Sequence, residues 1–212
     1  RYFKDPDLQR AFSFQNIYVG QSVYNAPAFF SMLAAVELTE GTLFPAGGMY
    51  GVVDALYKAA RDNGVEFNFN KTVEKIDTSG ESVKGVQFSD GTKELADIVL
   101  VNADLPNAYR LLLPDRKKTK KLGKKEYSCS AFVFHWGMDK VYGRLGHHSI
   151  FLSDEYKSNL RKIFREKSLA SNPSFYVHAP ARTDPGAAPP GMDTLSIIVP
   201  VGHISDKHDQ PW

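Results

Sequence analysis

The 212-residue sequence has little of what would place a protein outside the cell or across a membrane. Cys129 is its only cysteine, which excludes a disulfide framework or a thiolate metal cluster and favours an intracellular setting. No apolar run approaches the roughly 20 residues that span a bilayer, and residues 1–10 resemble neither a signal peptide nor a transit peptide. Basic and acidic residues number 26 and 24, so the overall charge gives no reason to expect a nucleic acid partner.

Several motifs of hydrolases and nucleotide-binding proteins are also missing. The sequence has no G-x-S-x-G, no H-E-x-x-H and no paired-carboxylate arrangement. The glycine-rich stretch Gly47–Gly51 lacks the G-x-G-x-x-G spacing and the preceding strand of a dinucleotide site, and no G-K-[S/T] follows it. We therefore expect these glycines to let the backbone turn sharply and pack closely, while bare amides at a helix start also allow close approach of a ligand.

The first 64 residues read mostly as helices. Asp5 and Pro6 have the residue types of a helix cap and a first helical position. Residues 26–38 predict a helix with apolar residues on nearly every side, so we expect this helix to be buried on most sides. A third helix follows the glycines, with Gly64 as its C-terminal cap and one apolar stripe formed by Met49, Val53, Leu56 and Ala60.

From residue 65 the hydrophobic period changes to two. Residues 65–76 alternate apolar and polar side chains, as a half-buried strand does. Turns at 78–81 and 89–91 then predict a β-meander. Residues 97–101, DIVLV, form the continuous apolar run typical of a strand buried on both faces, and polar Asn102 and Asp104 follow it at a point where a ligand can be met.

The remaining residues predict a short helix at 106–114, several strands and one charged helix at 154–167. The expected strands are 129–138, 147–153, 174–182 and 194–202. Helices, then a meander, then strands around an inserted helix indicate an α/β fold of the α+β-like or mixed kind.

Basic residues and histidines are the remaining candidates for binding. The run 116–125 has seven basic residues in ten and no interleaved aromatics, so a solvated loop is expected rather than a nucleic acid site, and an anionic membrane surface becomes the better partner if the substrate is a lipid. His147 and His148, adjacent in a strand, are expected to point to opposite faces and not to share a metal ion. We expect His135, His178 and His203 to be core histidines.

Six segments, in order, resemble the bacterial and fungal phytoene desaturases within the flavin-dependent amine-oxidase-like superfamily. The segments are 24–49 with its P-x-G-G-M turn, 64–76 with a V-x-x-I strand, 96–114 with N-A-D-L-P after an apolar run, 147–156, 173–195 and 197–203. The resemblance covers about residues 1–208. It implies an FAD-dependent oxidoreductase that removes hydride from a C–C bond of phytoene and sits on a membrane surface.

The same resemblance implies a domain organisation. Residues 1–64 would be the helical part of a substrate-binding domain, 65–113 a meander and strand returning to a Rossmann-type FAD-binding domain, and 114–212 the strands and helix of the substrate-binding domain, with a mixed or antiparallel sheet. The family's Rossmann glycine loop and its last FAD-contacting segment do not occur in these 212 residues. We therefore expect an internal piece of a longer protein, inactive alone and at most weakly bound to FAD.

By resemblance, seven residues lie near the cofactor: Val73, whose backbone would meet the adenine of FAD; Asn102, Ala103 and Asp104 beside the flavin; and Gly47, Gly48 and Met49, which with Pro45 would border the ring and the substrate cavity. No catalytic base and no metal site is assigned. The aromatic stretches 29–30, 132–136 and 175–176 suit an apolar channel, although core packing is the commoner explanation. A related amine oxidase, a retinol-saturase-like enzyme and a non-catalytic lipid-binding domain stay open as alternatives; segment 181–195 favours the carotenoid branch.

Overall fold

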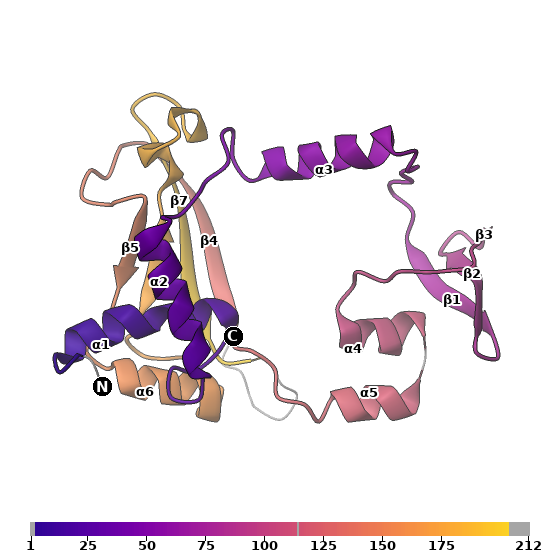
Figure 1. The fold of residues 1–212 in the computed structure, drawn as a ribbon, viewed down its shortest axis with the longest axis horizontal. Helices are drawn as coiled ribbons and strands as arrows, with labels where there is room; N and C mark the ends of the chain where they lie inside the picture. The colour runs from indigo at the N-terminus through magenta and orange to yellow at the C-terminus, as the bar shows by residue number, and fades with distance from the viewer. Residues whose placement is uncertain (1–2, 114, 204–212) are drawn as a thin grey trace. The chain divides into compact units, whose positions relative to one another are not determined.

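A computed structural model describes residues 3–113 and 115–203 (Figure 1). The chain divides into two compact units, one of Arg1–Ala59 with Tyr127–Trp212 and one of Ala60–Glu126. Residue 114, at the end of the expected helix 106–114, and the two chain ends on which the expectation of an internal piece depends lie outside the described residues. That the two units correspond to substrate-binding and FAD-binding domains stays a prediction.

The first unit is built on a four-stranded antiparallel sheet of order β4-β7-β6-β5. Its strands are β4 (Ser130–Met138), β5 (His148–Phe151), β6 (Phe175–His178) and β7 (Asp193–Val201). These ranges confirm the four strands expected from the apolar runs. One face of the sheet carries a buried core formed by Val177, Ala179, Leu195 and Ile197.

Short helices join this sheet along a second buried cluster of Phe14, Tyr156 and Leu160. They are α1 (Pro6–Ser13), a 3₁₀ turn (Phe14–Val19), another (Ala28–Phe30), α2 (Ser31–Thr39) and α6 (Tyr156–Arg161), which continues as a π-helical turn (Lys162–Glu166). The cap of α1 is confirmed, because the Asp5 carboxylate accepts the amide hydrogens of Asp7 and Leu8 at 2.7 and 3.1 Å.

The expected burial of segment 26–38 is wrong. Of the nine residues of α2 only Ala34 is buried, and Met32 and Val36 are 62% and 50% exposed. A helix that is apolar all round needs neighbours on every side. Among the described elements α2 meets α1 and the two adjoining 3₁₀ turns, which cover part of its circumference.

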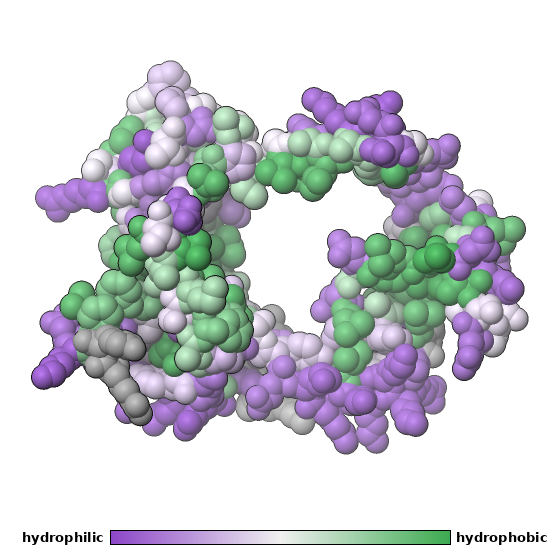
Figure 2. Space-filling view, in the orientation of Figure 1, coloured by the Kyte–Doolittle hydropathy of each residue, from purple (hydrophilic) through white to green (hydrophobic). Residues whose placement is uncertain are grey.

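Helix α3 (Tyr50–Asp62) confirms the predicted start after the glycines and the predicted cap. Gly64 has φ +82°, its amide donates to the Arg61 carbonyl at 2.9 Å, and the Val65 amide donates to the Ala60 carbonyl at 3.0 Å. These two bonds are the Schellman pattern, which needs a left-handed residue at this position. The apolar stripe of α3 is exposed and is visible as a green band along the helix (Figure 2).

The second unit contains the expected meander. Strands β1 (Val73–Ser79), β2 (Ser82–Phe88) and β3 (Lys93–Leu95) pair antiparallel in that order. They are followed by α4 (Leu105–Asn107), a π-helical turn (Ala108–Leu112) and α5 (Arg116–Leu122). Ile76, Phe88 and Ala108 are its buried apolar residues, so β1, β2 and the π-helical turn share one small core.

Three sequence expectations fail in this unit. Residues 65–72 are not a strand, so β1 begins at Val73 rather than Val65. Residues 97–101 are in no strand, and Ile98 and Leu100 are 86% and 93% exposed. A strand buried on both faces lies inside a sheet that other elements cover on each face, and no described strand pairs with this run.

The third failure is the basic run, which begins with helix α5 instead of a loop. Asp115 caps the helix by accepting the Lys118 amide hydrogen at 2.8 Å, and Lys, Arg and Leu are good helix formers. Within the described ranges, no helix combines the length and the apolar character needed to cross a bilayer.

Candidate functional site

The glycine-rich turn of the first unit is open on its outer side. Gly47 and Gly48 have φ +78° and +87°, and a Cβ at either position would meet nothing within 4 Å. The Gly48 amide donates to the Pro45 carbonyl at 3.0 Å, which closes the turn ahead of α3. The positive φ values confirm the expected sharp turn. The expected close packing inside the chain is wrong, and the bare backbone faces open space instead.

A cavity of about 590 Å³ lies against this turn. Its wall comes from the loop before α3, from the start of β5 and from the loop after β6: Thr42, Phe44, Pro45, Ala46, Gly47, His147, His148, Thr183 and Asp184. The cavity therefore combines an apolar side, a bare peptide and a group of polar side chains, which is the usual make-up of a small-molecule site.

Two histidines, His147 and His148, line this cavity, and His178 lies against them. The rings of His147 and His148 are 4.4 Å apart between centroids, and those of His147 and His178 are 4.7 Å apart. The Nε2 atoms of His147 and His178 lie 2.8 Å apart. The expected divergence of His147 and His148 is wrong, because β5 begins at His148 and His147 lies outside the strand.

Neighbouring groups orient these rings. His147 Nδ1 lies 2.6 Å from the Thr183 hydroxyl, and His148 Nδ1 lies 2.7 Å from the Tyr176 hydroxyl. Phe44, from the loop before the glycines, contacts His147 and His178 edge-on with centroids 5.4 and 5.6 Å away. Every ring is therefore held from at least one side.

Burial lowers the pKa of His178, and the neighbouring imidazoles of His147 and His148 lower it further. The pKa of His148 is lowered by burial and by His147. Both shifts favour the neutral imidazole. Among the described residues there is no group of three or more side chains placed to hold a metal ion.

An ion pair fixes the loop that carries Thr183. Arg182 and Asp193 form a bidentate pair with N–O distances of 2.6 and 3.2 Å, and the Asp193 side chain has no exposed area. Arg182 also donates to the carbonyls of Leu145 and Tyr142 at 2.9 and 2.8 Å. The pair therefore ties the loop after β6 to the loop before β5, on both sides of the histidines.

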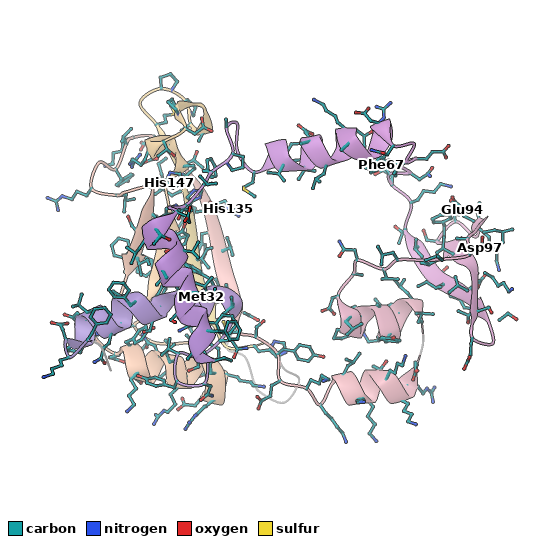
Figure 3. All side chains as sticks on the ribbon, viewed as in Figure 1. Met32, Phe67, Glu94, Asp97, His135 and His147 are labelled. Atoms are coloured by element: carbon teal, nitrogen blue, oxygen red, sulfur yellow. The ribbon has the colours of Figure 1, made fainter. Side chains whose placement is uncertain are left out.

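The other predicted histidines lie elsewhere. His135 on β4 is exposed rather than in the core, and its Nδ1 lies 2.9 Å from the Ser196 hydroxyl. Figure 3 shows His135 and His147 toward the same end of the sheet. The half-buried His203 stacks on Tyr127 with centroids 5.4 Å apart.

A second cavity of about 380 Å³ lies beside the 3₁₀ turn after α1. It is lined mainly by apolar and aromatic side chains, among them Phe14, Tyr18, Tyr176 and Ile198, together with Cys129. Burial raises the pKa of the Cys129 thiol and raises the pKa of Tyr18 to about 12. The thiol is therefore protonated at neutral pH and a poor nucleophile.

The second unit holds the other four predicted cofactor residues. Val73 is the first residue of β1, where the register shifts between Val73 and Lys75, so Glu74 is an extra residue against β2. Asn102 and Ala103 are exposed in the segment before α4. Asp104 caps α4 by accepting the Asn107 amide hydrogen at 3.1 Å. The structure thus shows a capping role for Asp104, and cofactor contact stays a prediction for all four.

Two of these features are compatible with the FAD contacts that the sequence resemblance implies. The left-handed Gly47 and Gly48 expose a backbone that a planar ring can approach, since a Cβ would find open space there. The register shift between Val73 and Lys75 leaves Glu74 as an extra residue beside Val73, and the peptide groups of such a bulge could read an adenine edge.

A model of the family described as flavin containing amine oxidoreductase matches residues 1–210. Phytoene desaturase from Fusarium fujikuroi is 43% identical over 206 residues, which cover 96% of this chain and 36% of that protein. A zeta-carotene-forming phytoene desaturase from Myxococcus xanthus is 42% identical over 204 residues, covering 96% of this chain and 39% of that protein. The chain thus spans little more than a third of the relatives it matches.

A solved structure shares the fold. An oxidoreductase from Methanosarcina mazei superposes with a TM-score of 0.64 at 21% identity, covering 95% of this chain and 45% of that one. Together with the helices and antiparallel sheets of the two units, this confirms the expected α/β fold of the α+β-like kind.

Proposed function

Because the chain belongs to the flavin containing amine oxidoreductase family, we propose that it is part of an FAD-dependent oxidoreductase that desaturates C–C bonds of phytoene in carotenoid biosynthesis. The observation that carries this proposal is the 43% identity to a phytoene desaturase along 96% of the chain. The activity is proposed for a longer protein that contains these residues, since they match only 36% of that relative.

In this proposal FAD supplies the hydride acceptor, and the chain positions the cofactor and the substrate. Each proposed contact is the one that the family resemblance implies for that residue. Gly47, Gly48 and Met49 would border the ring, and the Val73 backbone would meet the adenine. Asn102, Ala103 and Asp104 would lie near the flavin. The apolar wall of Phe44, Pro45 and Ala46 would hold a hydrocarbon against the turn and keep water out.

The test is to purify a longer protein that contains these residues and to measure flavin absorbance and phytoene conversion. We expect a yellow protein that makes desaturated product with FAD present. A colourless protein without flavin would refute the proposal, and turnover of amines instead of phytoene would favour an amine oxidase.

A matched pair of variants tests the glycine turn. Gly47→Ala and Gly191→Ala place a Cβ at nearly the same φ, +78° and +76°, with nothing within 4 Å of either Cβ. The backbone strain is therefore alike, but Gly47 lines the cavity and Gly191 does not. We expect at least tenfold weaker flavin binding or turnover for Gly47→Ala than for Gly191→Ala. Equal losses in the two variants would show that the glycine turn does not contact the flavin or the substrate.

We also propose that the protein lies peripherally on an intracellular membrane surface, with α5 as a contact. Support comes from exposed cations on and just after this helix: Arg116, Lys117, Lys120, Lys121, Lys124 and Lys125. Each lysine or arginine close to an anionic membrane surface contributes about 1 kcal/mol of electrostatic attraction.

Vesicle sedimentation tests this contact. The double variant Lys117→Glu/Lys121→Glu should bind more weakly to vesicles that contain phosphatidylserine. Added salt should likewise weaken vesicle binding by the unsubstituted protein, because salt screens the charges. The control Lys4→Glu/Lys157→Glu makes an equal charge change at exposed residues of the first unit. Equal binding by both double variants would refute a role for α5.

A further inference from the structure

The histidines at the 590 Å³ cavity belong to a longer polar row. Strand pairing places His135 opposite Ser196, Ser196 opposite His178, and His178 opposite His148. Directly paired residues of neighbouring strands lie on the same face of a sheet. The four polar side chains therefore cross all four strands in one line.

The next row on the same face is mostly apolar: Val133, Ile198, Tyr176 and Ile150. His135 and His148 are exposed on this face, whereas His178 is half-buried. A half-buried imidazole needs a hydrogen-bond partner, and His147 supplies one. The line ends at the cavity, where His147 joins it through the 2.8 Å contact with His178.

The contacts of His147 form a path for a proton. Two neutral imidazoles bond through their Nε2 atoms only if one of them carries the hydrogen, so His147 and His178 share one proton across 2.8 Å. At its other nitrogen His147 meets the Thr183 hydroxyl, which lines the cavity. A proton taken up at this wall can therefore pass from Thr183 to His147 and be shared with His178.

We propose that His147, His178 and Thr183 are the proton-accepting group for the substrate in this cavity. The inference rests on the proposed function, since desaturation must release a proton. In R–CH₂–CH₂–R′ → R–CH=CH–R′, one carbon loses a hydride to the oxidised flavin. The C–H electrons of the neighbouring carbon form the double bond, and its proton passes to the imidazole pair through Thr183.

The surroundings suit a base that stays uncharged until it is used. Burial and mutual repulsion lower the pKa of His148 and His178, so the group as a whole accepts one positive charge in preference to two. Phe44 covers two of the rings and Tyr176 holds His148. A shared proton spreads the new charge over two rings in an apolar setting.

Asp184 is the other base on the cavity wall, and it is the weaker candidate. Its Oδ1 accepts the Gly186 amide hydrogen at 2.9 Å and caps the short 3₁₀ turn (Pro185–Ala187). That oxygen is therefore already engaged in holding the turn. Asp184→Asn is therefore an informative comparison with the histidine variants.

The test uses the longer protein with FAD and phytoene, and it follows flavin bleaching in a single turnover. We expect His147→Gln and His178→Gln to slow bleaching about 10²-fold or more, the range for a lost general base, with KM nearly unchanged and the acidic limb of the pH–rate profile lost. His203→Gln, which stacks on Tyr127 away from the cavity, should keep the full rate and profile.

Two further readouts separate proton acceptance from a structural role. Added imidazole should restore part of the rate of His147→Ala, because it can enter the cavity. Histidine NMR of the unsubstituted protein should show one hydrogen shared between the Nε2 atoms of His147 and His178, and His178→Gln should abolish that signal.

The outcomes distinguish the two proposals. If the unsubstituted protein contains no flavin and is inactive, the proposed function and this inference are both refuted. Active unsubstituted protein with full rates in both histidine variants would overturn the inference alone, as would loss of the acidic limb only in Asp184→Asn.

Discussion

Replacing Asp193 by asparagine should destabilise the first unit strongly. The carboxylate has no exposed area and accepts two bonds from Arg182 and one from each of the Tyr142 and Thr194 amides. Asparagine keeps the size but removes the charge and one acceptor. Arg182, whose side chain is only 18% exposed, is then left as a nearly buried cation without its counterion.

The magnitude follows from that geometry. Breaking a buried ion pair by removing one partner costs about 3–5 kcal/mol, because the remaining charge stays desolvated. Part of the loss is offset here, since Arg182 keeps its bonds to two backbone carbonyls. We therefore expect the free energy of unfolding to fall by about 3 kcal/mol, which is a large share of the stability of a typical domain, about 5–15 kcal/mol.

Tryptophan fluorescence can follow this loss in a urea titration. The sequence contains two tryptophans, Trp136 and Trp212, and Trp136 belongs to the first unit. In a Trp212→Phe background the reporter is Trp136 on β4, which pairs with Leu195 two residues from Asp193 on β7.

Asp7→Asn is the matched control. Asp7 pairs with Arg10 on α1, but its side chain is 79% exposed, and exposed pairs contribute no more than about 1 kcal/mol. In a double-mutant cycle, Arg182→Met with Asp193→Asn should cost less than the sum of the two single changes. A loss for Asp193→Asn no larger than that for Asp7→Asn would refute the view that this pair holds the loops around the histidines.

Three further predictions concern single groups. Gly85→Ala should destabilise the second unit and loosen β3 in hydrogen exchange, because the new Cβ would lie 2.0 Å from a β3 carbonyl oxygen at φ +144°; Gly91→Ala, with open space at its Cβ, should leave β3 protected. His148 and His178 have lowered folded pKa values, so the unfolded state binds protons first and stability should fall below about pH 6.5, the ordinary histidine pKa; a flat profile would contradict this. Cys129, with its raised pKa, should react with a thiol reagent at pH 8 more slowly in the folded protein than in urea, and equal rates would show an accessible thiolate.

Local patterns in the sequence predicted much of the fold. The Asp5 cap, the Gly64 cap, the meander and the four strands of the larger sheet follow from residue types at neighbouring positions, and each is present. These features are set by hydrogen bonds and side-chain alternation within a few residues of each other. Burial was predicted less well, because it depends on elements distant in the sequence: α2 and residues 97–101 are apolar but exposed.

In the candidate site, too, the local motif was predicted and the contacts between distant segments were not. The glycine turn was visible as a motif, and its open backbone agrees with an approach site. The histidine group was missed because its members come from β6 and from the start of β5, and only the strand register brings His178 to His147. The sequence did contain one signal for this group, the adjacent pair His147 and His148. The expected strand began at His147, one residue before β5, so side-chain alternation placed the two rings on opposite faces.

The exposed run 97–101 has a practical consequence for handling the chain. Its residues 98–101 are uncharged and contain no proline, and three of the four are β-branched. Exposed Ile98 and Leu100 make this stretch a template to which a second extended backbone can add. Asp97 and Asp104 flank the stretch, and their charges oppose stacking. Purified at high concentration, the 212-residue chain should form oligomers through this run before either compact unit unfolds. A single charge at Val99, inside this uncharged stretch, is the change that would keep the chain monomeric.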